Sequence, residues 1–238
     1  MLIDYTGKKV LVTGGTKGIG EKLVVDFKNL GATVFFTGRG TRGSGMGDGF
    51  IQCDFSDEVQ LKKVCDLIKT LKIDVLINNA GTNKIGPIEE YSSDDYESIL
   101  NLNLTSCFKI TQAVIPHMKE NGYGRIVNIT SISSEISMPL RSAYCSSKFG
   151  LLGLTKVSGV ELASHGILVN AVGPGVTKTK LTVDVLGEEK MDEISKNVPI
   201  GRLGEVEDVS NVVMFMASDL NTYMVGQNIL VDGGYTCV

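Results

Sequence analysis

Residues 13–20 read Thr-Gly-Gly-Thr-Lys-Gly-Ile-Gly (TGGTKGIG), and this stretch decides the fold. It follows the apolar, strand-like run 9–12 (KVLV) and precedes a segment with the apolar spacing of a helix. Glycines at such a turn allow a sharp change of chain direction and a close approach of phosphate to the backbone, while the helix N-terminus offers free N–H groups. The stretch therefore predicts an α/β fold whose first turn holds a nucleotide phosphate.

On both sides of this turn, short apolar runs alternate with longer segments of helical period, and the alternation extends along the whole chain. The predicted strands are residues 9–13, 33–37, 50–53, 75–78, 125–130, 167–172 and 228–231. The predicted helices are residues 18–30, 57–70, 94–118, 143–164, 188–197 and 205–217. Nearly continuous apolar strands between helices are typical of a buried parallel sheet. We expect residues 1–238 to form one domain, a Rossmann-like, doubly wound parallel sheet of about seven strands with helices on both faces.

Residues typical of helix ends indicate where some of the predicted helices begin or end. Ser56 is a candidate N-cap for the helix that follows it, and Gly31 and Gly166 stand where helices end in left-handed geometry. Residues 39–49 (RGTRGSGMGDG) carry five glycines, so we expect a flexible loop there rather than a helix.

Composition excludes several classes of function. A net charge of −4 argues against a nucleic-acid-binding protein, which usually carries a basic stripe. The chain has neither a signal-like apolar segment at its start nor a run long enough to cross a membrane. Its five cysteines form no CxxC pair, which favours reduced thiols in a cytoplasmic protein, and with two histidines we expect no metal site.

The end of the second predicted strand indicates which nucleotide binds. Nicotinamide sites that take NAD usually carry an acid about 20 residues beyond the glycines, where it binds the ribose 2′-OH. Residues 37–39 read Thr-Gly-Arg instead. The Arg39 guanidinium suits a 2′-phosphate, and Lys17 and Arg42 add positive charge nearby. The sequence therefore favours NADP(H) over NAD(H).

A second pattern carries proton-transfer chemistry. Tyr144 and Lys148 lie one helical turn apart, so an ammonium stands near a phenol and stabilises its ionised form. Tyr5 and Lys9 have the same spacing, but no further candidate catalytic residue is expected near them. Near Tyr144, in contrast, we expect Ser131, which follows the strand 125–130 and so lies at the carboxyl edge of the sheet, where α/β proteins bind ligands. We therefore choose Tyr144 and Lys148 as the reactive pair.

With these two patterns the chain resembles the short-chain dehydrogenase/reductases, in their compact form of about 250 residues. The resemblance covers the whole chain, and its motifs appear in order. They are residues 13–20, Asn78-Asn79-Ala80-Gly81, Asn103, Ser131, Tyr144 with Lys148, Asn170 with Pro174-Gly175, and Val231-Asp232-Gly233-Gly234. The resemblance implies an oxidoreductase that transfers a hydride between a nicotinamide and a carbonyl or alcohol substrate.

The resemblance also implies a role for each catalytic residue. Tyr144 is the general acid or base, and Lys148 holds the nicotinamide ribose and stabilises the ionised Tyr144. Ser131 bonds the substrate oxygen, and Asn103 binds a water that links Lys148 to a proton relay. The implied cofactor contacts are Gly14, Thr16, Lys17, Gly18, Ile19, Gly20, Arg39, Asp54, Phe55, Asn79, Ala80, Gly81, Tyr144, Lys148, Pro174, Gly175, Val176, Thr177 and Thr179. Asn79 and Asn103 have an alternative interpretation as structural amides that hold loops together.

The substrate itself stays open. The family resemblance implies a mobile lid at about residues 177–198, and Glu135 and Met138 are candidate substrate contacts beside Ser131 and Tyr144. A small carbonyl or alcohol fits this pocket, and so does a 3-oxoacyl-[acyl-carrier-protein], which gives one alternative function. A catalytically silent NADP(H) sensor is the other. Long helices with apolar residues on more than one face indicate a subunit interface, and the family resemblance implies that it forms a homotetramer or a homodimer.

Overall fold

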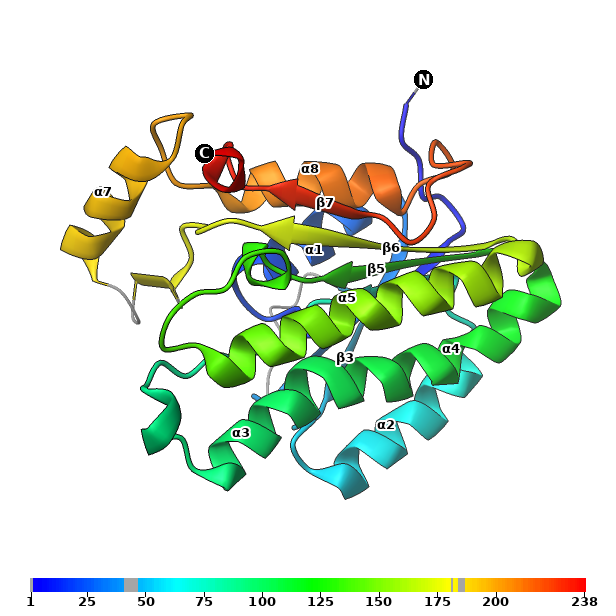
Figure 1. Cartoon of the computed structure of the whole chain (residues 1–238). Helices are drawn as coiled ribbons and strands as arrows, with labels where there is room; N and C mark the ends of the chain where they lie inside the picture. The colour runs from blue at the N-terminus through cyan, green and yellow to red at the C-terminus, as the bar shows by residue number, and fades with distance from the viewer. Residues whose placement is uncertain (1, 41–46, 181, 184–186) are drawn as a thin grey trace.

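One seven-stranded sheet forms the centre of the molecule in the computed structural model, which describes residues 2–40, 47–180, 182–183 and 187–238 (Figure 1). All paired strands are parallel, in the order β3-β2-β1-β4-β5-β6-β7. The strands are β1 (Lys9–Val12), β2 (Thr33–Gly38), β3 (Gly49–Gln52), β4 (Val75–Asn78), β5 (Gly124–Ile129), β6 (Ile167–Pro174) and β7 (Asn228–Val231). The predicted doubly wound parallel sheet is confirmed.

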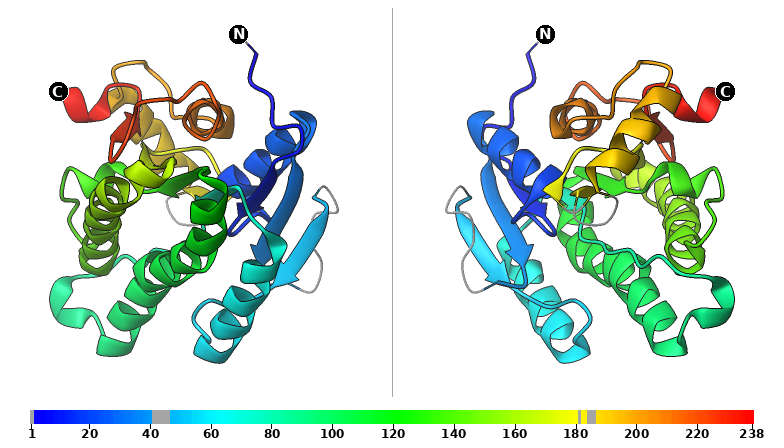
Figure 2. Two further views of the ribbon diagram at one scale, coloured as in Figure 1. Left: turned by 90° about the vertical axis from the view of Figure 1, so that its right-hand side faces the viewer. Right: turned by 90° about the vertical axis from the view of Figure 1, so that its left-hand side faces the viewer.

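Helices cover both faces of this sheet (Figure 2). On one face, α1 (Gly18–Asn29) and α8 (Val206–Met216) pack side by side and share a core with β1, β2 and β4. On the other face lie α2 (Glu58–Leu71), α4 (Ser106–Asn121) and α5 (Ser142–Leu162). In the central strands β1 and β4, residues 10–12 and 75–77 are fully buried between the two helical layers, which explains why they are all apolar.

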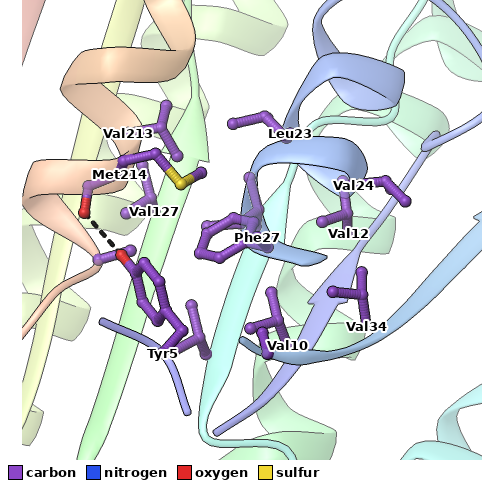
Figure 3. Packing of buried hydrophobic residues seen from close by; sticks show 14 of the residues in the cluster. Tyr5, Val10, Val12, Leu23, Val24, Phe27, Val34, Val127, Val213 and Met214 are labelled. Atoms are coloured by element: carbon purple, nitrogen blue, oxygen red, sulfur yellow. Dashed lines mark hydrogen bonds between the residues drawn. The ribbon is translucent and has the colours of Figure 1, made fainter. Parts of the chain in front are cut away.

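Tyr5 belongs to the core under α1 and α8 (Figure 3). Its ring packs edge-on against Phe27, with 4.8 Å between the centroids, and its hydroxyl donates to the Met214 carbonyl at 2.6 Å. Burial raises the pKa of Tyr5 well above its ordinary value, since the phenolate would lose its hydration there. The Tyr5–Lys9 spacing is therefore a structural coincidence, and Tyr5 anchors the N-terminal segment.

The predicted uninterrupted helix 94–118 is wrong in one respect. The chain forms α3 (Ser93–Leu100), a widened π-turn (Asn101–Thr105) and then α4, and Ser92 accepts the Asp95 N–H as N-cap of α3. A π-turn inserts extra backbone into a helix and is frequent at functional sites. Periodicity alone does not reveal it, because the apolar pattern continues through it.

Two other boundaries differ from expectation. Asp57 rather than Ser56 is the N-cap of α2, and it accepts the Val59 and Gln60 N–H groups; Ser56 instead donates to Asp54. The predicted loop 39–49 ends earlier, since Gly49 begins β3. Residues 41–46, including Arg42, lie outside the described residues.

The remaining elements are short. Positive φ values of 88° at Gly31 and 73° at Gly166 confirm the predicted left-handed helix ends. The other described elements are η1 (Ile88–Glu90), η3 (Ile132–Ser134), η4 (Ala163–His165), α7 (Glu188–Asn197) and η5 (Tyr235–Cys237). No helix in the described part of the chain combines the length and apolarity that a membrane crossing needs. In that same part, no three His, Cys, Asp or Glu side chains gather as a metal site would require.

Candidate active site

A cleft of about 390 Å³ opens at the carboxyl ends of the strands. It lies beside β1 and β4, which are neighbours without being consecutive, so it occupies the switch point where α/β sheets bind ligands. The sequence-predicted residues that line it are Gly14, Thr16, Lys17, Gly18, Ile19, Gly20, Arg39, Asp54, Phe55, Asn79, Ala80, Gly81, Ser131, Tyr144, Lys148, Pro174, Gly175, Val176, Thr177 and Thr179. Asn103, Glu135 and Met138 lie outside this lining.

The glycine-rich turn is held rigidly by its neighbours. The Asn79 amide donates to the carbonyls of Thr13 (2.9 Å) and Gly14 (3.1 Å), and Thr37 Oγ1 accepts the Gly14 N–H. A Cβ at position 20 would lie 2.2 Å from the Gly14 carbonyl oxygen, so only glycine lets α1 start this close to the turn. Asn79 thus has the structural role that the sequence left open, and it holds the turn against the cleft.

Positive charge stands at one side of the cleft. The exposed Lys17 and Arg39 both line it, and neither forms an ion pair with another described residue. Hydrogen bonds from the Ser56 hydroxyl and N–H, with Arg39 nearby, hold the pKa of the Asp54 carboxyl below its usual value. The two cations are therefore available to an anionic ligand.

The cleft also contains a thiol. Burial raises the pKa of Cys53 to about 12, and burial also raises the pKa of Cys107, outside the lining, to about 11. A nucleophilic cysteine must ionise near neutral pH. Both thiols stay protonated there, which fits a packing role.

Tyr144, Lys148 and Ser131 also line this cleft. Lys148 is 4% exposed, donates to the Ile129 carbonyl at 2.7 Å, and lies 5.7 Å from the centroid of the Tyr144 ring. Ser131 follows β5 and its Oγ accepts the Ser133 N–H at 3.1 Å. The segment after the carboxyl end of β5 and the first turns of α5 thus place a hydroxyl, a phenol and an ammonium in the same cleft.

Asn103 lies in the π-turn and does not line the cleft. It is fully buried, and its amide pairs with both backbone groups of Thr82, each at 2.9 Å, and donates to Ser147 Oγ at 3.0 Å. Ser147 in turn donates to the Tyr144 carbonyl at 2.7 Å. Asn103 therefore positions both the loop after β4 and the first turns of α5, and its expected contact with a water stays a prediction.

The turn that carries Ser131 is tied to β7. Asn228 donates to Ser134 Oγ at 3.2 Å and to Glu135 Oε1 at 3.0 Å, while its own oxygen accepts from Thr130 at 2.7 Å. In this network the Glu135 carboxylate is turned toward Asn228 and lies outside the cleft lining, so its expected contact with a substrate stays a prediction. Met138 Sδ lies 3.3 Å from Ser133 Oγ, also outside the lining.

Comparison with known proteins identifies the family. Residues 14–236 match a family model described as enoyl-(acyl carrier protein) reductase. The 3-oxoacyl-[acyl-carrier-protein] reductase of Chlamydia pneumoniae is 38% identical, over 99% of this chain and 100% of its own length. The same-named reductase of Rickettsia bellii is 35% identical and is covered in full.

The chain belongs to the short-chain dehydrogenase/reductase family. Among solved structures of similar fold, one from Beutenbergia cavernae assigned as an NAD(P)-dependent gluconate 5-dehydrogenase, with bound NADP, superimposes with a TM-score of 0.94. It is 31% identical and covers 99% of both chains. A gluconate 5-dehydrogenase from Burkholderia cenocepacia, in complex with NADP and tartrate, has a TM-score of 0.91 and 29% identity over 99% of this chain and 97% of its own. The predicted family is confirmed.

Several lining residues of this short-chain dehydrogenase/reductase were missed from the sequence. They are Thr37, Gly38, Cys53, Thr82, Asn83, Leu102, Ile129, Thr130, Lys180 and Thr182. All of them except Thr182 lie within two residues of a predicted site residue, so extending each motif by two residues would have found those nine. Asn228 gave no such signal, since its partner Glu135 is 93 residues away in the chain.

Proposed function

We propose that this protein is an NADP(H)-dependent oxidoreductase that interconverts a small-molecule carbonyl and the corresponding alcohol. The observation that carries the proposal is the meeting of Ser131, Tyr144 and Lys148 in the same cleft as the glycine-rich turn. Proton-transfer groups and a phosphate-binding turn in one cleft are what hydride transfer to a carbonyl requires. The NADP-bound structures among its relatives support the same cofactor.

The cleft fits a dinucleotide. A Cβ at Gly14 or Gly20 would collide with Ala80 or with the Gly14 carbonyl, so glycine lets the turn pack closely against β4 and α1. The N-terminus of α1, which follows this turn, would offer its free N–H groups to a pyrophosphate. Lys17 and Arg39 would bind the 2′-phosphate, which favours NADP(H) over NAD(H). All the cofactor contacts expected from the family line the cleft, and we propose them as the binding residues.

Each catalytic residue would act either on the substrate oxygen or on another catalytic residue. The nicotinamide supplies or accepts the hydride. The Tyr144 hydroxyl donates the proton to the substrate oxygen in reduction and takes it back in oxidation, and Ser131 Oγ stabilises the charge that develops there. Lys148, held by the Ile129 carbonyl, keeps an ammonium near the phenol. Asn103 is a positioning residue.

The test is NADPH oxidation against a carbonyl panel of simple ketones, 5-ketogluconate and acetoacetyl-coenzyme A, with NADH in parallel. We expect turnover of at least one class with NADPH and weaker turnover with NADH. If no carbonyl is reduced and neither nucleotide binds by calorimetry, the proposed function is wrong.

A 3-oxoacyl-[acyl-carrier-protein] reductase is the second candidate, favoured by full-length identity of 35–38% to curated enzymes of that name. Such an enzyme must dock an acidic carrier, which needs basic residues near the cleft. Lys119, in the last turn of α4, and His165, in η4, lie just before the starts of β5 and β6 and outside the cleft lining, so neither provides such a docking residue. Acetoacetyl-coenzyme A in the panel separates this candidate from the other carbonyl classes.

We further propose a homotetramer, with a homodimer as the alternative. Helices α4 and α5 expose Phe108 (50%), Phe149 (45%), Val157 (51%) and Val160 (78%). Apolar side chains gathered on neighbouring helices are typical of a subunit interface. Light scattering at micromolar concentration is expected to give a mass of four chains, and a monomer would contradict the proposal.

Residues 177–198, which include α7, would form the lid over the substrate. Leu181, Val185 and Leu186 of this segment lie outside the described residues.

Because all five cysteines are free, we also propose a cytoplasmic location, which cell fractionation checks.

A further inference from the structure

Asn83 has a side chain that no described residue satisfies. Its Oδ1 is shielded from solvent and has no hydrogen-bond partner within the described residues, and the residue lines the cleft. Of the two other orphaned atoms found in that part of the chain, Asn78 Oδ1 lies in the core, where the amide nitrogen of Asn78 is bonded to Thr111 and Asn128. A buried acceptor without a donor is unfavourable, so Asn83 Oδ1 calls for a donor from a bound molecule.

The loop that carries Asn83 is held on both sides of Asn83, and Asn83 lines the same cleft as Ser131 and Tyr144. Its neighbour Thr82 has both backbone groups held by Asn103. Three residues further on, the Gly86 N–H donates to the Leu140 carbonyl at 2.9 Å, which ties this loop to the segment that leads into α5 and Tyr144. The orphaned Ser142 Oγ lies on that second segment, two residues before Tyr144. Two unsatisfied polar groups thus belong to the two tied segments that flank the proton donor.

We propose that Asn83 is a specificity-determining residue whose amide binds a substrate hydroxyl near the reacting carbonyl, so that the substrate is a hydroxylated ketone or the matching polyol. A hydroxyl can donate to Oδ1 and accept from Nδ2 at once. The alkyl chain of a 3-oxoacyl thioester has no donor for Oδ1 and would leave it buried and unpaired. The inference rests on the proposed oxidoreductase function and narrows its substrate class.

A matched pair of ketones tests this inference. 1,3-Dihydroxyacetone and 3-pentanone differ only in that each hydroxyl is replaced by a methyl group. With NADPH, we expect the natural protein to prefer dihydroxyacetone by about tenfold or more in kcat/KM. Asn83→Leu should lose about tenfold or more on dihydroxyacetone while activity on 3-pentanone stays within about threefold. Asn83→Ser, which keeps a hydrogen-bonding group, should recover part of the loss.

Two controls separate the possible causes. Asn29→Leu makes the same chemical change at an exposed position at the end of α1 and should leave both activities unchanged. NADPH affinity, measured by calorimetry, should be the same for Asn83→Leu and the natural protein. If Asn83→Leu does not fold, two measurements still test the inference. They are the preference of the natural protein between the two ketones and the kcat/KM of Asn83→Ser on each ketone.

Three results would overturn the inference alone: a preference for 3-pentanone, equal losses on both ketones, or a loss of NADPH affinity that makes Asn83 a cofactor contact. Failure to reduce these ketones and every member of the carbonyl panel is a different outcome. It counts against the proposed function, and the inference falls with it.

Discussion

Tyr144→Phe is expected to lower kcat by about 10²- to 10⁴-fold, with NADPH affinity unchanged within about threefold. The substitution removes only the hydroxyl, which is the proposed proton donor to the substrate oxygen. The ring keeps its place on α5, and the Lys148 bond to the Ile129 carbonyl does not depend on the hydroxyl. Stopped-flow or steady-state NADPH oxidation measures the rate, and calorimetry measures the affinity.

This substitution also separates an enzyme from a silent sensor. A sensor has no use for a proton donor, so its nucleotide binding and any ligand-dependent response would be the same with phenylalanine. Tyr5→Phe is the matched control for the rate, because Tyr5 bonds the Met214 carbonyl in the core. It should cost stability but leave kcat within about twofold, as expected of a buried hydrogen bond remote from the cleft. A Tyr144→Phe protein with unimpaired kcat would show that another group transfers the proton.

Arg39→Asp is expected to raise the Kd for NADPH by about 10- to 150-fold, the range for losing charge-assisted hydrogen bonds. Arg39 lines the cleft, and no described carboxylate within salt-bridge distance competes for its guanidinium. The introduced carboxylate would repel a 2′-phosphate but can bond a ribose 2′-OH, so the Kd for NADH should hold or fall. Calorimetric titration with both nucleotides measures the change in preference.

Lys119→Asp is the matched control for Arg39→Asp. It changes the net charge by the same amount at an exposed position in the last turn of α4, away from the cleft lining. If both substitutions weaken NADPH binding equally, the effect comes from overall charge and Arg39 is no specific contact. Salt should weaken the Arg39 contribution, since ions screen exposed charges.

The sequence by itself determined the succession of strands and helices along the chain, the parallel sheet and the glycine-rich turn. These features depend on local properties: apolar periodicity, helix-end residues, and glycine where no Cβ fits. The pairing of Tyr144 with Lys148 was also available, because residues four apart in a helix share a face. Ser131 could be added because its place just after a strand puts it at the carboxyl edge of the sheet.

Only the tertiary structure decided which polar groups are already satisfied. Glu135, which the sequence places near Ser131, has its carboxylate bound by Asn228, 93 residues away. Asn103 proved to be bonded to Thr82 and Ser147, whereas Asn83 Oδ1 was left without a donor among the described residues. Sequence patterns report which side chains can form hydrogen bonds, but the partner is chosen by packing between distant segments. For that reason the sequence predicted the fold and the reactive pair, and the three-dimensional contacts were needed to find the group that we propose binds the substrate hydroxyl.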